Sequence, residues 1–171
     1  MKKTVLLCIM VCCLQAVQAQ LPCSADAYRK LDFWIGNWEA FGPKGTKAGD
    51  SKISVILDSC IVLEEWTSAA VTKGIRFSGK SFNTYNKSTG QWQQTWVDNV
   101  AGSTEYLRGE GTDGKVVFYA DKVVGPNGKT FLRRLTFTKL DEDKVRQLGE
   151  RSDDGGTTWT TEYDLEYRRK K

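Results

Sequence analysis

The chain contains no histidine among its 171 residues. This absence excludes catalytic triads with an imidazole base, and zinc or haem sites that depend on a histidine ligand. Without histidine, an acyl-transfer enzyme would need a nucleophile activated by another residue, and no pattern in the sequence indicates one. The short acidic turns at 141–144 and 152–156 lack the loop length and terminal Glu of an EF-hand, so solvated turns are the simpler interpretation. We therefore expect no cofactor and no metal.

The sequence also has little excess charge of one sign and few long apolar runs. Its 25 Lys and Arg face 21 Asp and Glu, which leaves a formal net charge of +4. That excess is too small and too dispersed to indicate nucleic-acid binding, and the basic segment YRRKK at 167–171 is typical of a solvated chain end. The single long apolar run, TVLLCIMVCCL at 4–14, is too short to span a membrane as a helix.

That apolar run has the layout of a signal peptide. Lys2 and Lys3 precede it, and Val17 and Ala19 occupy the third-last and last positions before a cleavage site. We predict that residues 1–19 are a signal peptide and that 20–171 form one exported domain, periplasmic or extracellular. Neither the cysteines at 12 and 13 nor the one at 23 follows the small residue that a lipoprotein motif requires, so no membrane anchor is expected.

Cysteine is scarce once the signal peptide is removed. Three of the five cysteines lie within residues 1–19, which leaves Cys23 and Cys60. An even pair in an exported protein predicts a disulfide bond. Two separate thiols are the alternative.

The remaining sequence is rich in strand and turn signals. One helix is expected over 24–33, with Ser24 as its N-cap. After Gly36 the chain reads as strands separated by turns rich in Gly, Asn and Asp. The predicted strands are 37–42, 51–58, 61–70, 75–85, 91–98, 103–110, 115–124, 130–139, 144–152 and 158–168. The pattern favours an all-β fold: a single closed or nearly closed antiparallel up-and-down barrel of about 8–10 strands with a short N-terminal helix.

The stretch SDDGGTTW at 152–159 matches the Asp-box of sialidase-type β-propeller blades. A propeller needs several blades, and this chain has one such box and no repeat of blade length. We interpret the stretch as a tight hairpin turn at 153–157 that joins strands 144–152 and 158–168. Asp154 would accept turn amides, Gly155 and Gly156 would take positive φ, and Trp159 would start the last strand on its apolar face.

The N-terminal motif LDFWIGNWEAF carries the clearest family resemblance. A short helix followed by Gly36-x-Trp38 resembles the opening of the calycin group of barrels, which includes lipocalins and fatty-acid-binding proteins. In that group the glycine permits a sharp turn, and the tryptophan closes one barrel end beneath an arginine near the end of the last strand. The resemblance assigns that arginine to Arg168 or Arg169, and Arg169 has the parity of the apolar face.

The chain is also similar, over nearly its whole exported part, to a group of uncharacterised exported bacterial proteins. The shared features are F-W-I-G-x-W at 33–38, the segment from Cys60 to Trp66, W-x-Q-x-W-x-D at 92–98, and V-R-Q at 145–147 before DGG at 154–156. This similarity implies fold and compartment rather than an activity. The haem-binding nitrobindins resemble the same barrel class, but their haem ligand is a histidine, so haem does not carry over.

Polar residues within apolar strand faces are the candidate binding residues. Alternation places aromatic and polar side chains together on single faces, and a buried Arg or Glu needs a partner or a ligand. The candidate walls are Trp66, Trp96 and Tyr163, and the candidate polar anchors are Glu64, Gln94 and Arg133. The favoured function is therefore non-catalytic binding of a small, partly apolar molecule in the barrel lumen.

Three alternatives remain open from the sequence. In the first, the protein is an envelope or matrix module whose partner is another macromolecule, and its aromatic side chains fill the lumen. An internal Arg–Glu pair would explain the polar residues without a ligand. A hydrolase would need a carboxylate pair from Glu64, Glu65, Asp98 and Glu105, none of which the spacing singles out.

Overall fold

A computed structural model describes residues 22–125 and 128–171 of the chain. The predicted signal peptide lies outside these residues. The chain begins with a short bent helical segment made of two 3-10 helices, η1 (Asp26–Tyr28) and η2 (Asp32–Trp34). The N-cap position of η1 is occupied by Ala25, so Ser24, the expected cap, lies one residue earlier. Within the described residues, no helix is long and apolar enough to cross a membrane.

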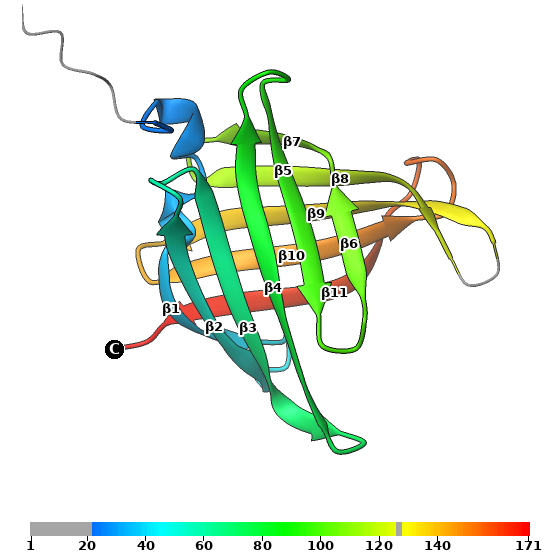
Figure 1. Ribbon diagram of the computed structural model, residues 1–171. Helices are drawn as coiled ribbons and strands as arrows, with labels where there is room; N and C mark the ends of the chain where they lie inside the picture. The colour runs from blue at the N-terminus through cyan, green and yellow to red at the C-terminus, as the bar shows by residue number, and fades with distance from the viewer. Residues whose placement is uncertain (1–21, 126–127) are drawn as a thin grey trace, which may run out of the picture.

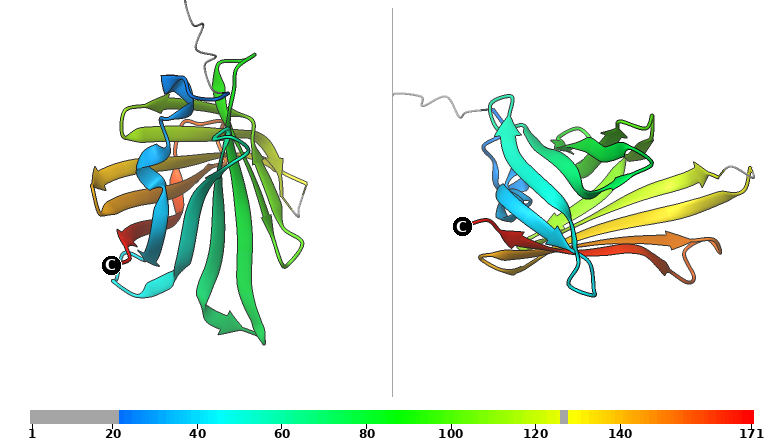
Figure 2. Two further views of the ribbon diagram at one scale, coloured as in Figure 1. Left: turned by 60° about the vertical axis from the view of Figure 1, so that its left-hand side comes forward. Right: turned by 90° about the horizontal axis from the view of Figure 1, so that it is seen from below.

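Eleven antiparallel strands form one sheet that curves into a nearly closed barrel (Figures 1 and 2). The sheet order β6-β5-β4-β3-β2-β1-β11-β10-β9-β8-β7 is a meander in which the first strand pairs with the last. The all-β barrel prediction is therefore confirmed. The strands are β1 (Gly36–Phe41), β2 (Lys47–Ile56), β3 (Ile61–Thr72), β4 (Ile75–Asn86), β5 (Gln91–Asp98), β6 (Ser103–Tyr106), β7 (Arg108–Thr112), β8 (Lys115–Val124), β9 (Thr130–Asp141), β10 (Lys144–Ser152) and β11 (Thr160–Arg169).

The barrel is incomplete at the seam between β6 and β7. The sequence predicted one strand over 103–110, but this strand is interrupted at the exposed Leu107. Its two halves, β6 and β7, form the two opposite edges of the sheet. β7 then lies across β5: the Gln93 side-chain amide donates to the Leu107 carbonyl at 3.1 Å. A Cβ atom on Gly109 would lie only 2.7 Å from the Trp92 carbonyl oxygen. Glycine in β7 therefore permits the close crossing that covers the seam.

One end of the barrel is closed by Trp38 and Arg169. The Arg169 guanidinium lies 4.2 Å from the centre of the buried Trp38 ring and donates to the Ile35 carbonyl at 3.1 Å. The Trp38 indole N–H donates to the Trp34 carbonyl at 2.8 Å. Gly36 has a φ of 142°, and a Cβ atom there would lie 2.3 Å from Arg169 Nη1. Glycine is thus required both by the turn and by the arginine packed against it.

A disulfide bond joins Cys23 to Cys60, with a Cα–Cα distance of 5.0 Å, as predicted. It fastens the segment before η1 to the turn between β2 and β3. The Arg29 guanidinium reinforces this link by donating to the Ser59 carbonyl. The closed end is therefore held by a covalent bond as well as by packing.

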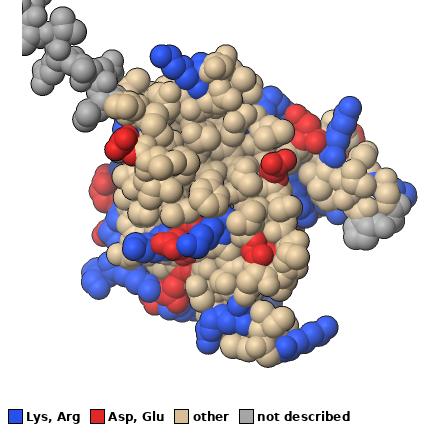
Figure 3. Space-filling view, viewed as in Figure 1, with Lys and Arg blue, Asp and Glu red and all other residues tan. Residues whose placement is uncertain are grey.

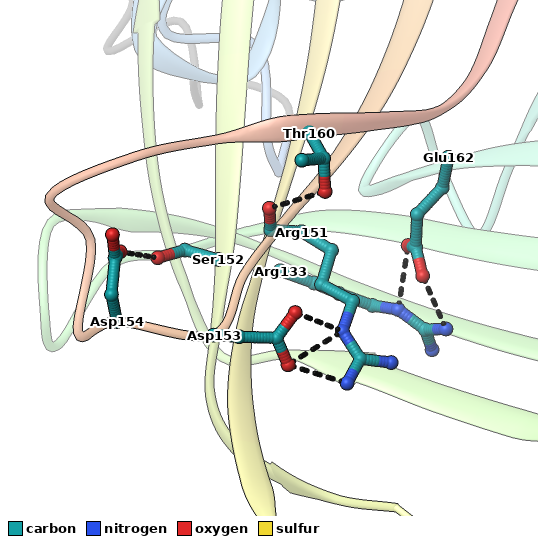
Figure 4. A network of polar contacts seen from close by, with 7 residues as sticks. All are labelled: Arg133, Arg151, Ser152, Asp153, Asp154, Thr160 and Glu162. Carbon is teal, nitrogen blue, oxygen red and sulfur yellow. Dashed lines mark hydrogen bonds and ion pairs between the residues drawn. The ribbon is translucent and has the colours of Figure 1, made fainter.

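The turn over SDDGGTTW joins β10 to β11, and Figure 4 shows part of its polar network. Asp154 accepts the Thr158 amide at 2.9 Å and the Ser152 hydroxyl at 2.8 Å. Gly155 and Gly156 have φ of 73° and 95°, as the turn prediction required. The prediction for Trp159 is wrong: the residue precedes β11, and its ring packs 4.4 Å from the Arg134 guanidinium.

A β-bulge explains the misplacement of Trp159. Gly149 pairs with Tyr163, yet the next residue, Glu150, pairs with Thr161, so β11 contains one extra residue at Glu162. An extra residue reverses the in–out alternation of the strand from that point toward its start. Trp159 therefore does not share the face of Tyr163, although simple alternation placed it there.

Candidate functional site

The barrel interior is built in layers along its strands, because every second side chain of a strand points inward. On β3 the inward residues run Val62, Glu64 and Trp66, and on β5 they run Trp92, Gln94 and Trp96. The first layer is apolar and lies nearest the helical segment and the closed end. The second layer is polar, and the third is aromatic. The site is therefore a polar floor on an apolar core, with aromatic walls above it.

Above the core lies a cavity of about 470 Å³, at the end of the barrel away from the helical segment. All six binding candidates taken from the sequence line it. The complete lining is Ala48, Glu64, Trp66, Ser68, Phe77, Gln94, Trp96, Thr104, Tyr106, Arg133, Gln147, Glu162, Tyr163, Leu165 and Tyr167. A volume of this size is within the usual range for small-molecule sites. The aromatic side chains thus line the lumen without filling it.

Glycines on neighbouring strands keep the lumen open. A Cβ atom on Gly49 would lie 2.5 Å from the Trp66 ring, and one on Gly79 would lie 2.3 Å from the Trp96 ring. On the other side, a Cβ atom on Gly149 would lie 2.4 Å from the Tyr163 ring. Each wall ring therefore lies flat against bare backbone. A larger residue at any of these glycines would push the ring toward the middle of the cavity.

The polar floor centres on Glu64, whose side chain is only 2% exposed. Its Oε1 accepts the Ser51 hydroxyl at 3.0 Å and the Tyr167 hydroxyl at 3.1 Å. Its Oε2 accepts the Ser81 hydroxyl at 2.9 Å. Tyr167 is also 2.7 Å from Gln147 Oε1, so its single proton is shared between two acceptors. Four strands converge on this carboxylate, which fixes its position.

The amide groups of the floor are oriented by a backbone carbonyl. Asn83 Nδ2 donates to the Val62 carbonyl at 2.9 Å, so Asn83 Oδ1 must be the end that receives Gln94 Nε2, at 2.7 Å. Asn83 Nδ2 also donates to the Ser81 hydroxyl at 3.0 Å. Gln94 therefore has one of its two N–H groups bonded within the floor, and its carbonyl oxygen and second N–H are left for a ligand.

Burial raises the pKa of the Glu64 carboxyl group. Removal from water raises the pKa of its carboxyl from 4.5 to about 6, although the hydroxyls of Ser81, Ser51 and Tyr167 act in the opposite direction. The carboxyl is therefore mainly ionised at neutral pH and becomes neutral in mild acid. Burial likewise raises the pKa of Tyr106 to about 12, so this wall residue stays neutral.

The mouth of the cavity carries a paired arginine. Arg133 donates to both carboxylate oxygens of Glu162, from Nε at 2.8 Å and from Nη2 at 3.0 Å (Figure 4). Alternation had placed Glu162 on the face opposite Tyr163, but the bulge brings both residues to the cavity. The internal Arg–Glu pair considered from the sequence thus exists for Arg133, whereas Glu64 has no such partner.

The other carboxylates considered for catalysis lie elsewhere. Glu65 pairs with Lys80 at 2.8 Å and Glu105 is exposed. Asp98 accepts the Gly102 amide at 2.8 Å in the β5–β6 turn. Among the described residues, no group of three or more His, Cys, Asp or Glu side chains could hold a metal ion. Of the four carboxylates named, only Glu64 faces the lumen.

Several site residues were missed from the sequence. Ser81 and Asn83 are buried on β4, while the intervening Phe82 is 37% exposed. Hydrophobicity alone would turn Phe82 inward and both polar residues outward. Only the register of the folded sheet reveals them: Ser81 pairs with Glu64 on β3 and Asn83 with Gln94 on β5, so polar residues align across three strands.

The outer surface in the view of Figure 3 gives no comparable signal. Charged side chains of both signs are scattered over this face, with broad uncharged areas between them. This face has no concentrated charge of one sign, and the cavity is the better-defined feature.

Comparisons with known proteins identify no family. No family model matches the chain. No curated protein matches it either. Among solved structures, the chain is similar to a redesigned β-barrel at 11% identity, with a TM-score of 0.41, over 84% of this chain and 96% of that chain.

Proposed function

We propose that this protein is an exported, non-catalytic barrel of the calycin type that binds a small, partly apolar molecule in its lumen. The observation that carries the proposal is the cavity of about 470 Å³, which aromatic walls line and a polar floor closes. Small-molecule sites combine mostly apolar walls with a few oriented polar groups. Here Trp66, Trp96 and Tyr163 are the walls, and Glu64, Gln94 and Arg133 are the polar groups.

Family and compartment belong to the same proposal. The motif F-W-I-G-x-W at 33–38 and the Trp38–Arg169 stack support membership of the calycin-like group of exported bacterial proteins. The apolar N-terminal run and the Cys23–Cys60 bond support export. The filled-barrel alternative is disfavoured because the lumen is hollow.

The proposal is tested with the neutral apolar dye Nile red. The dye should brighten on binding to the wild-type protein, and Ser68→Phe, which places a ring in the cavity, should weaken binding at least about tenfold. The control is Thr67→Phe, one residue along the same strand on the outer face. Equal binding to the wild type and to Ser68→Phe would show that the dye binds outside the lumen.

The natural ligand is sought by native mass spectrometry of the protein purified from its own host. A mass adduct carried by the wild type and by Thr67→Phe, and absent from Ser68→Phe, would identify the lumen occupant. An adduct retained by Ser68→Phe would place that molecule elsewhere on the protein.

A further inference from the structure

Glu64 is a buried charge without a cation. None of the ion pairs between described residues includes it. Its three partners, Ser51, Ser81 and Tyr167, are hydroxyl groups, which carry no compensating charge. Buried charges in proteins are normally paired. Among the described residues nothing supplies a positive charge to this carboxylate, so a ligand in the cavity is the available source.

The floor offers hydrogen-bond acceptors to a ligand. Glu64 lines the cavity, and its carboxylate has about four acceptor positions, of which the three hydroxyls occupy three. Gln94 also lines the cavity, and its bond to Asn83 uses one of its two amide hydrogens, which leaves its carbonyl oxygen as a further acceptor. A ligand group that binds the Glu64 carboxylate must donate hydrogen bonds.

The other charges of the site cancel one another. Arg133 and Glu162 form a two-point pair, so the mouth adds no net charge. The remaining titratable lining groups are Tyr106, Tyr163 and Tyr167, and burial raises the pKa of each phenol, so they stay neutral. Glu64 alone therefore determines the charge of the cavity, which is negative at neutral pH.

The walls add a second attraction for positive charge. Trp66 and Glu64 are two residues apart on β3, and Trp96 and Gln94 are two apart on β5, so each ring stands directly above a floor group. Aromatic faces attract cations, and the attraction is stronger where water is excluded.

We propose that the lumen binds an organic cation: an amine, protonated at neutral pH, with a flat or extended apolar body. The ammonium group donates to Glu64 and to the Gln94 carbonyl oxygen, and the apolar body lies against Trp66 and Trp96. A carboxylate ligand such as a fatty acid is disfavoured with its head group on the floor, because that group would meet Glu64. This inference rests on the proposed function and names the ligand class for the same cavity.

The test compares three probes of similar length: 4-phenylbutylamine, 4-phenylbutanol and 4-phenylbutyrate. Each is titrated into the protein by calorimetry at about pH 7.5, where an amine with a pKa of about 10 is protonated. The amine should bind at least about tenfold more tightly than the alcohol, because hydrogen bonds to charged groups are the stronger ones. The carboxylate should bind most weakly.

Matched variants assign the preference to Glu64. Glu64→Gln should remove the advantage of the amine over the alcohol, measured as the ratio of the two affinities in the same variant. Glu65→Gln, the next residue on the same strand, pairs outside with Lys80 and should behave as the wild type. A Glu64→Gln protein that keeps the full preference would overturn the inference.

The pH dependence of wild-type binding gives a test that needs no variant. Glu64 has a pKa of about 6, so protons compete with the amine below that pH. Amine affinity should fall by about tenfold for each pH unit below it, while alcohol affinity stays constant. Flat amine affinity between about pH 8 and pH 5 would contradict the inference.

Nile red separates the two possible failures. If the dye binds in the lumen but the amine is not preferred, the cation inference is wrong and the binding barrel stands. If neither the dye nor any of the three probes binds, the proposed function fails together with the inference.

Discussion

At the scale of the residue, Glu64 carries an energetic cost that the proposed function would explain. A carboxylate that is 2% exposed and has only hydroxyl partners is less stable ionised than it would be in water. Its raised pKa expresses this cost, because the folded protein holds a proton there more tightly than the unfolded chain does. In the proposed function, a cationic ligand supplies the missing positive charge.

The pH dependence of stability tests this account in the ligand-free protein. Below pH 4.5 Glu64 is protonated in both states, and as pH rises from there through about 6 the folded state loses a tightly held proton. The free energy of unfolding should fall over this window. Glu64→Gln should remove that fall and be more stable by about 2 kcal/mol near pH 8.

Urea denaturation of both proteins at several pH values provides the measurement. The difference between the two curves isolates Glu64 from the other carboxyls, such as Asp154, whose hydrogen bonds to Thr158 lower its pKa to about 2. Stability curves that run parallel from about pH 4 to pH 8 would show that Glu64 is not strained by ionisation.

At the scale of the element, the strands hold the lumen open by pairing large rings with glycines. The three atoms nearest to a Cβ atom placed on Gly149 all belong to the Tyr163 ring, whereas the positions at Gly49 and Gly79 also meet backbone carbonyls. Gly149 is thus the cleanest site at which to alter one wall. The bulge beside it in β11 brings Glu162 to the mouth and so completes the pair with Arg133.

Gly149→Ala should narrow the cavity. The added methyl group must displace the Tyr163 ring into the lumen, and overpacking of this kind costs about 1–3 kcal/mol. Nile red affinity should drop several-fold, and urea denaturation should show the lost stability. Gly42→Ala is the control, because the only atom near its Cβ position is the Thr46 carbonyl oxygen at 3.9 Å. Unchanged dye affinity in Gly149→Ala would mean that Tyr163 is not a wall of the occupied space.

At the scale of the whole molecule, the stabilising contacts and the cavity lie at opposite ends of the barrel. The closed end holds the Trp38–Arg169 stack, the Cys23–Cys60 bond and the apolar core around Trp34. The other end holds the cavity and its mouth. Changes at one end should therefore leave the other largely intact, since distant sites act almost independently.

Removal of the disulfide tests this separation. The bond closes a long loop, with a sequence separation of 37, so a double change of Cys23 and Cys60 to Ser should cost about 2–4 kcal/mol. Denaturation should show this loss, while Nile red affinity measured well below the melting temperature stays as in the wild type. Wild-type protein treated with a reducing agent should match the double variant. An equal loss of dye affinity would show that the two ends are coupled.

The sequence by itself determined the features that depend on local pattern. Alternation within single strands placed Glu64 with Trp66 and Gln94 with Trp96 on inward faces, and turn residues located the hairpin around Asp154. The cysteine count sufficed to pair Cys23 with Cys60. The inward faces follow from the two-residue period of a strand, the hairpin from the φ preferences of glycine, and the disulfide from the even number of cysteines.

Only the tertiary structure decided what these residues do together. The bulge that brings Glu162 to the lumen, the glycines beneath the wall rings and the alignment of Ser81 with Glu64 all depend on cross-strand register. The same holds for charge: Arg133 is neutralised by Glu162 and Glu64 is not. Register is set by the folding of the whole sheet, because each strand position acquires its partners only when distant segments meet.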